Sequence, residues 1–281
     1  MDLIHQRIRD YQPASKEEEL NAYKEICQEI ALAALARANF FQKGAFQGGT
    51  CLRIVHQLDR FSEDLDFVLE EPDPHFQWTP YLHAMESEFA AQGLNLKAVD
   101  RSKGNTVVKK AFLKDDSFGQ ILTLNYPRSR ADNQTIRIKL EIDTNPPKGS
   151  KNAAHVINYP FPFSLITHDL PTLFSGKCVA LLCREYVKGR DWYDFLWYMR
   201  NKTLINYPYL KNALAQNQLY TDLPQSIDRI WLLDALSDKI RTIDWEQAKG
   251  DTRRFIRADR QHVIDAWSKE LFLQIVQSLL I

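Results

Sequence analysis

A pair of glycines followed by a pair of aspartates constrains the fold of this chain more than any other feature of its sequence. Gly48 and Gly49 precede a segment whose apolar residues have the spacing of a short helix. Asp64 and Asp66 then flank a single leucine and lead into the apolar run 67–69, a pattern typical of a strand on which alternate residues share a face. We therefore expect a glycine turn that enters a helix, followed by a strand that presents two carboxylates together.

This combination indicates metal-dependent chemistry on a nucleotide. Two neighbouring carboxylates repel each other unless a cation lies between them, and Mg²⁺ is commonly held by one or two carboxylates and by substrate phosphate. Glycines let the backbone approach a phosphate closely, and a helix start offers free N–H groups. Taken alone, each half is more often an ordinary turn or a strand with solvated acids. Together they predict a Mg²⁺ site at Asp64 and Asp66 and a phosphate-binding turn at Gly48, Gly49 and Thr50.

The segment 48–67 resembles the AbiEii/AbiGii-type toxin nucleotidyltransferases, which belong to the polymerase-β-like nucleotidyltransferase superfamily. The residues that carry the resemblance are Gly-Gly-Thr, Arg53, Arg60, Ser62, Glu63 and Asp-Leu-Asp-Phe. It implies an α+β fold, with a mixed sheet flanked by helices and a mainly helical C-terminal region. It also implies nucleotide binding at Gly48, Gly49, Thr50, Arg60 and Ser62.

The same resemblance implies a function. Such an enzyme moves a nucleotide from a nucleoside triphosphate (NTP) to an acceptor, here expected to be RNA, because some relatives act on tRNA. It would be the toxin of a bacterial toxin-antitoxin or abortive-infection system, with a cognate antitoxin protein as its partner. Mg²⁺ would bridge the phosphates, and no activated serine or cysteine nucleophile would be needed.

Residues 135–144 alternate between apolar and polar side chains, which predicts a further strand. Its polar face carries Arg137, Lys139, Glu141 and Asp143. The resemblance places a third acid at Glu141, where it would complete the metal site or accept the proton of the attacking hydroxyl. Asp143 could take that role instead, and a half-exposed strand of mixed charge would show the same pattern.

Residues 177–200 have apolar positions at helical spacing on both sides of Gly189. Lys177 and Arg184 would share a helix face, as would Asp191 and Asp194. By resemblance Lys177 would contact the triphosphate and Asp191 would orient Lys177 or a basic partner. Arg184 and Arg190 would support them. The alternative is a helical hairpin whose charges are solvated or paired along its surface.

Four segments read as successive strands of an antiparallel meander: 94–100, 106–113, 120–126 and 135–143. From about residue 170 the pattern is helical, and Pro160 and Pro162 mark a boundary near 160–170. We expect a nucleotidyltransferase domain at 1–165 and a helical domain at 166–281 that contributes Lys177 and Asp191 to a cleft between them. A fragment of residues 1–165 should then be inactive.

Composition and charge bear on whether the protein binds nucleic acid. The chain has 281 residues, 44% of them hydrophobic, and equal numbers of acidic and basic residues, 36 each, so no overall charge favours nucleic acid. Two local basic patches could contact RNA, although acidic residues interrupt the second, and a solvated helix face explains that patch better than acceptor binding does. They are Lys103, Lys109, Lys110, Lys114, Arg128 and Arg130, and a helix with Arg253, Arg254, Arg257 and Arg260 whose Phe255, Ile256 and Val263 face inward.

Two further expectations, on the cellular location and on zinc, follow from features that the sequence lacks. There is no signal region at the start, and the longest apolar helix candidate, 30–41, is interrupted by Arg37 and Asn39. We expect 30–41 to be an amphipathic helix packed on the catalytic sheet, and the protein to be cytoplasmic with no membrane partner. The four cysteines have no CxxC spacing, which argues against zinc.

Two rival functions remain. One is a nucleotide-binding interaction protein without turnover, which the presence of both aspartates, a candidate third acid and Lys177 disfavours. The other is a nucleotidyltransferase that modifies a small molecule or a protein hydroxyl. Acceptor choice depends on surface shape, so the sequence does not separate this enzyme from one that acts on RNA.

Overall fold

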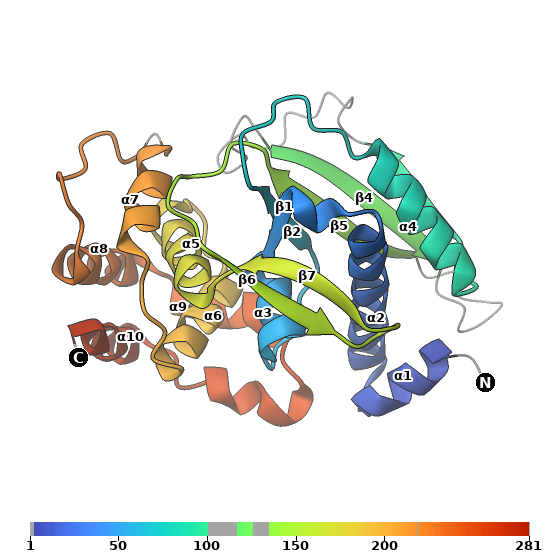
Figure 1. Ribbon diagram of the computed structural model, residues 1–281. Helices are drawn as coiled ribbons and strands as arrows, with labels where there is room; N and C mark the ends of the chain where they lie inside the picture. The colour runs from blue at the N-terminus through green and yellow to red at the C-terminus, as the bar shows by residue number, and fades with distance from the viewer. Residues whose placement is uncertain (1–2, 101–116, 126–134, 218, 281) are drawn as a thin grey trace. The chain divides into compact units, whose positions relative to one another are not determined.

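A computed structural model describes residues 3–100, 117–125, 135–217 and 219–280 (Figure 1). The chain divides into two compact units. The first comprises Met1–Gln57, Phe61–Pro146 and Asn152–Thr167, and the second comprises Leu58–Arg60, Pro147–Lys151 and His168–Ile281. The predicted strand 106–113 and the basic patch from Lys103 to Arg130 lie outside the described residues.

The first unit is built on a mixed sheet of seven strands in the order β3-β4-β5-β2-β1-β7-β6 (Figure 1). β5 pairs with β2 in parallel and with β4 antiparallel, while β1 is antiparallel to β2 and parallel to β7. The strands are β1 Gly44–Gln47, β2 Leu65–Leu69, β3 Leu96–Asp100, β4 Ser117–Asn125, β5 Thr135–Asp143, β6 Asn152–Ile157 and β7 Phe163–His168. With its helices this confirms the expected α+β class.

The described residues of this unit form the helices α1 Leu3–Tyr11, α2 Lys16–Arg37, α3 Gly48–His56 and α4 Thr79–Ala91. α2 contacts α1, α4 and β5, so it runs through the centre of the unit. Residues 25–35 are buried on every side of this helix. The expectation of an amphipathic helix at 30–41 was therefore wrong: the helix begins at Lys16 and ends at Arg37, and neighbours surround it.

Burying α2 on all sides requires partners for its polar residues. The Arg53 guanidinium donates to Glu25 at 2.7 Å, and the Arg7 guanidinium donates to Glu29 at 3.0 Å. Gln28 donates to the backbone carbonyls that precede β2, as described below. These contacts satisfy buried polar groups that would otherwise be costly. They also give Arg53 a structural partner in the first unit.

The second unit is helical among its described residues. Its helices are α5 Leu170–Cys183, α6 Gly189–Arg200, α7 Tyr207–Ala215, α8 Arg229–Thr242, α9 Trp245–Arg253 and α10 Lys269–Gln277, with a 3-10 turn at Ala258–Ile264. Trp192 of α6 packs edge-on against Trp245 of α9 and Phe272 of α10. This aromatic core joins the helices that surround α6.

Gly189 lets α6 pack closely against α9. A Cβ at this position would overlap the Ala248 carbonyl oxygen and the Thr252 hydroxyl. We expect Gly189→Ala to lower the free energy of unfolding by about 1–3 kcal/mol through overpacking. Gly250→Ala is the matched control, because Gly250 lies within α9 and an added Cβ there would meet nothing within 4 Å. This variant should be stabilised by about 0.5–1 kcal/mol. Urea unfolding should show opposite shifts, and equal shifts would contradict this packing argument.

Candidate functional site

The sheet brings two of the predicted acids side by side. In the parallel pairing of β2 with β5, Asp66 is in register with Glu141, and the neighbouring Leu65 is in register with Leu140. Leu65 and Leu140 are buried, which leaves Asp66 and Glu141 together on the opposite face. Asp64 lies two residues before Asp66, at the entrance to β2.

Asp143, the alternative third acid, lies farther along β5. It is in register with Val68 and not with either aspartate. Its carboxylate accepts a hydrogen bond of 3.0 Å from the Asn145 backbone N–H, in the turn that follows the strand. The geometry therefore favours Glu141 as the partner of Asp66.

A lysine supplies positive charge to this acidic group. The Lys139 ammonium pairs with the Glu141 carboxylate, and Asp64 and Asp66 also attract it. Burial lowers the pKa of Lys139, but the three carboxylates outweigh burial and leave this pKa above its ordinary value. Asp64, Asp66 and Glu141 thus already share a cation.

This arrangement bears on whether the acids fit a metal ion. As placed, no three His, Cys, Asp or Glu side chains among the described residues form a ready metal-binding group. The donors are nevertheless hard carboxylate oxygens gathered around a positive charge, the ligand type that Mg²⁺ takes in proteins. The chemical type of these ligands suits Mg²⁺, and the Lys139 ammonium would compete with the ion for the same carboxylates.

Gly48 closes the turn between β1 and α3 against Asp66. Its φ is 80°, in the left-handed region, and a Cβ there would overlap the Asp66 carboxylate. Gly48, Gly49 and Thr50 form the first turn of α3, where backbone N–H groups have no partner within the helix and can bind an anion. Glycine at 48 is thus required both by the backbone conformation and by the approach to Asp66.

The two reasons for glycine at position 48, the positive φ and the contact with Asp66, can be tested separately. We expect Gly48→Ala to abolish most activity, because the added methyl group must displace the Asp66 carboxylate. Gly93→Ala is the control: its φ is also positive, at 74°, but an added Cβ there would meet nothing within 4 Å. Both variants carry the backbone strain of about 1–2 kcal/mol. An equal loss of activity in both would mean that strain alone, and not the contact with Asp66, requires the glycine.

The loop before β2 is held from two sides. The Thr50 hydroxyl donates to the Asp64 carbonyl oxygen. The Gln28 side-chain amide donates to the carbonyls of Ser62 and Glu63, at 3.1 and 2.9 Å. Gln28 comes from the buried helix α2, so these bonds fix the backbone that leads to Asp64. Predicted nucleotide-binding residues Thr50 and Ser62 therefore take part in positioning the acids.

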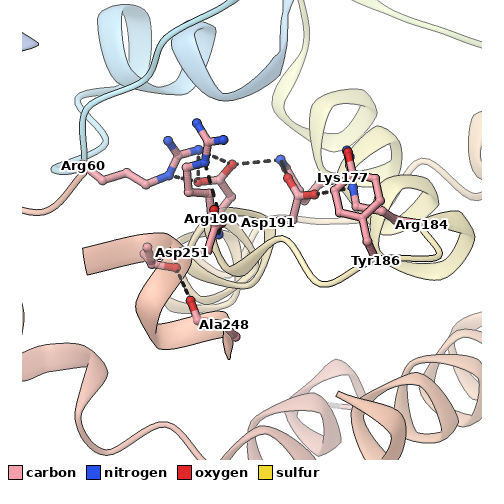
Figure 2. Close-up of polar contacts among 10 residues, drawn as sticks. Arg60, Lys177, Arg184, Tyr186, Arg190, Asp191, Ala248 and Asp251 are labelled. Carbon is pink, nitrogen blue, oxygen red and sulfur yellow. Dashed lines mark hydrogen bonds and ion pairs between the residues drawn. The ribbon is translucent and has the colours of Figure 1, made fainter. Parts of the chain in front are cut away.

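Four charged residues of the second unit lie together: Lys177 on α5, Asp191 and Asp194 on α6, and Arg60 in the segment Leu58–Arg60 (Figure 2). The Lys177 ammonium lies 2.7 Å from Asp191 and 2.8 Å from Asp194. Arg60 forks onto Asp194 with two hydrogen bonds of 2.7 Å, and its side chain is only 3% exposed. Asp191 pairs with Lys177, one of the two partners that the resemblance implied for it. Asp194, predicted only as a neighbour of Asp191, holds both cations.

The basic residues of this cluster outnumber its acids. Burial disfavours the ionised forms of Asp191 and Asp194, but the cations that face them keep both pKa values below the ordinary range. Those cations are Arg60, Lys177, Arg184 and Lys188. Four positive charges thus face two carboxylates, which favours binding of a further anion.

Arg184 and Arg190 lie at opposite sides of Asp191 (Figure 2). Arg184 follows the last residue of α5, and its Nε lies 3.1 Å from Asp191. It also contacts Tyr186 through a hydrogen bond and through the ring face. Arg190 lies over the Phe255 ring at 4.0 Å and 3.8 Å from Asp251. The loop residues Tyr186 and Lys188 were not predicted as site residues.

The second predicted basic patch differs from expectation. α9 ends at Arg253 and a 3-10 turn begins at Ala258, so the arginines do not lie on one helix. Phe255 and Ile256 are buried as predicted, whereas Val263 is 48% exposed. The guanidinium groups have nearby acidic or aromatic partners: Arg253 with Asp265, Arg254 with Phe255, Arg257 with Asp259, and Arg260 with Asp59. These pairings weaken the case for an RNA surface at this patch.

Comparison with known proteins identifies the class. The chain belongs to the nucleotidyl transferase AbiEii toxin family of type IV toxin-antitoxin systems, whose family model matches residues 30–272. It is therefore a nucleotidyltransferase of toxin-antitoxin type, as the motifs of the sequence indicated. No match was found among curated proteins.

One solved structure supports the fold. JHP933 from Helicobacter pylori is 16% identical, with a TM-score of 0.50, and the match covers 92% of this chain and 89% of that one. A second H. pylori structure, of a protein provisionally described as a nucleotidyltransferase, is also 16% identical, with a TM-score of 0.49 and coverage of 90% and 89%. In the part of this chain that the structure describes, no helix is both long and apolar enough to cross a membrane.

Proposed function

We propose that this nucleotidyltransferase depends on Mg²⁺ and transfers a nucleotide from an NTP to RNA, with tRNA as the expected acceptor. The observation that carries the proposal is the register of Asp66 with Glu141 beside a shared cation. Acids arranged in this way suit a reaction that needs mainly positioning and charge neutralisation.

Asp64, Asp66 and Glu141 would hold the metal. When bound, Mg²⁺ would supply positive charge that offsets the negative charge building on the leaving pyrophosphate. Lys139 would have to release Glu141 before that carboxylate could bind the metal or accept the proton of the attacking hydroxyl. Asp64 is held at its carbonyl by Thr50, which limits how far the acids can move apart.

Each unit, taken by itself, offers residues that would bind a phosphate. The first turn of α3, Gly48 to Thr50, offers backbone N–H groups. Lys177, Arg184 and Arg190 of the second unit offer positive charge, while Asp191 keeps Lys177 in place at 2.7 Å. Arg60 would act through Asp194, because its guanidinium is buried against that carboxylate.

The acceptor and the setting are further parts of the proposal. Family membership makes a cognate antitoxin protein the expected partner and the cytoplasm the expected location. An RNA acceptor is favoured because a toxin that modified tRNA would stop growth by blocking translation. A hydroxyl of a protein or of a small molecule is the rival acceptor, and it would use the same residues for the NTP.

The acceptor can be tested directly. Purified protein is incubated with Mg²⁺, total bacterial RNA, a bacterial protein extract and each of the four NTPs labelled at the α-phosphate. We expect label in a band of tRNA size, with one NTP preferred, and no label when EDTA removes the metal. Label in protein would refute the RNA acceptor, and label that persists in EDTA would refute the metal requirement.

A growth assay tests the role as a toxin. Expression of the protein in bacteria should inhibit growth, and the substitutions Asp64→Ala and Asp66→Ala should each relieve the inhibition. The variants must accumulate as folded protein for the comparison to hold. Inhibition that is unchanged in both variants would show that toxicity does not arise from nucleotide transfer.

A further inference from the structure

The loop between α5 and α6 carries two exposed or partly exposed residues that the predicted site does not use. Lys188 is the last residue before α6, and Tyr186 lies two residues earlier. Both belong to the second unit and adjoin the cluster formed by Lys177, Arg184 and Asp191. Nothing in the predicted mechanism assigns a role to either side chain.

Lys177 has little capacity left for a ligand. Its ammonium has three N–H groups, and two carboxylates already bind it, at 2.7 and 2.8 Å. Its side chain is only 11% exposed. A triphosphate could therefore reach at most one of its N–H groups without breaking an existing ion pair.

In the part of the chain that the structure describes, the Lys188 ammonium, in contrast to that of Lys177, has all its N–H groups available for a ligand. Among the described residues its ammonium makes no hydrogen bond and no ion pair within 4 Å, although Asp191 attracts it at longer range. Burial lowers its pKa, and the positive charges of Arg184, Arg190 and Lys177 lower it further. A partly buried cation with like-charged neighbours and no close partner is stabilised by an anion. Phosphate oxygens would supply that anion, and lysine binds them as a point charge.

Tyr186 adds an aromatic surface next to this cation. The residue is 55% exposed, and the Arg184 guanidinium lies 4.8 Å from its ring centroid (Figure 2). Arg184 is itself held by Asp191 at 3.1 Å, so the ring is supported from one side. An exposed aromatic ring backed by arginine is a common platform for stacking a nucleobase.

We propose that the α5–α6 loop is a nucleotide-recognition element in which Lys188 binds a phosphate oxygen of the NTP and the Tyr186 ring stacks on its base. This inference rests on the proposed function, because it takes the NTP as the ligand of the basic cluster. Lys177 has at most one N–H group left for the phosphates, so Lys188 adds a phosphate contact to those of Lys177 and Arg184. The phosphate and the base are recognised by different side chains of one short loop.

The two roles can be separated by comparing an NTP with inorganic tripolyphosphate, which has the phosphates but no base. Binding of ATP, CTP, GTP, UTP and tripolyphosphate is measured by calorimetry in the presence of Mg²⁺. Lys188→Met should weaken the binding of both kinds of ligand about tenfold. Tyr186→Ala should weaken NTP binding about tenfold and leave tripolyphosphate binding unchanged. Tyr186→Phe should bind every ligand as the wild type does.

The controls distinguish the possible failures. Lys269→Met removes a lysine on α10 whose side chain is 50% exposed and should change no affinity. If the wild type binds and transfers an NTP while Lys188→Met and Tyr186→Ala bind it normally, the inference is wrong and the proposed function stands. If Tyr186→Ala weakens tripolyphosphate as much as the NTPs, the ring is not a base platform. A wild type that binds no NTP would refute both proposals.

Discussion

Asp194→Ala is expected to destabilise the second unit by about 3–5 kcal/mol, the typical effect of removing one partner from a buried ion pair. Asp194 is fully buried and receives two hydrogen bonds from Arg60 and an ion pair from Lys177. Without it, the 3% exposed Arg60 side chain would lose its close anionic partner in a site that water barely reaches. A loss of this size would show that the carboxylate stabilises the second unit, whatever it contributes to catalysis.

Urea unfolding followed by tryptophan fluorescence measures this effect well, because five of the six tryptophans lie in the second unit: Trp192, Trp197, Trp231, Trp245 and Trp267. Asp238→Ala is the matched control. Asp238 pairs with Arg241 on α8, but its side chain is 80% exposed, so its loss should cost less than about 1 kcal/mol. Similar midpoints for the two variants would contradict a structural role for the Arg60–Asp194–Lys177 network.

Asp66→Asn should remove nearly all transfer activity and leave the fold intact. The substitution keeps the shape of the side chain that contacts Gly48 but removes the negative charge next to Glu141. We expect the rate to fall about 10³-fold or more, since loss of one electrostatic contact to a transition state costs about 10²–10³ and a metal ligand is lost as well. Thermal unfolding should change little, because Asp66 is only partly buried.

Glu71→Gln is the control for this variant, because Glu71 is an exposed carboxylate just beyond β2. It should transfer label at the wild-type rate. Comparing Glu141→Gln with Asp143→Asn then identifies the third acid. The register with Asp66 predicts the larger loss for Glu141→Gln, and a larger loss for Asp143→Asn would place the third acid two residues farther along β5.

Local patterns in the sequence predicted the elements that carry the acids. The alternation in residues 135–143 gave β5 with the bounds that the structure has, because one face of that strand is buried and the other is not. The glycine pair and the apolar spacing after it predicted α3 for a similar reason. Such patterns depend only on residues that are close in the sequence, so they can be recognised without knowledge of the three-dimensional structure.

Contacts between distant residues could not be predicted in this way. The parallel register of Asp66 with Glu141 depends on the order of strands in the sheet, and the fork of Arg60 on Asp194 joins residues far apart in the chain. The expectation of an amphipathic helix failed because α2 is buried on all sides. Polar residues such as Gln28 suggest a solvent-exposed face, and the sequence does not show the buried partners that they have in the structure. Lys188 lies in the motif 188–194 but was assigned no role, because the sequence does not show that its ammonium lacks a close partner.

The most direct test of the central claim is a comparison of two labelled forms of the same NTP. Nucleotidyl transfer attaches the α-phosphate to the acceptor and releases pyrophosphate, so label at the α-phosphate should appear in RNA and label at the γ-phosphate should not. The α-label should be absent from RNA when Asp66→Asn replaces the wild type. Transfer of the γ-label would instead indicate a kinase-type reaction, and failure of the α-label to reach any acceptor would contradict the assignment as a working nucleotidyltransferase.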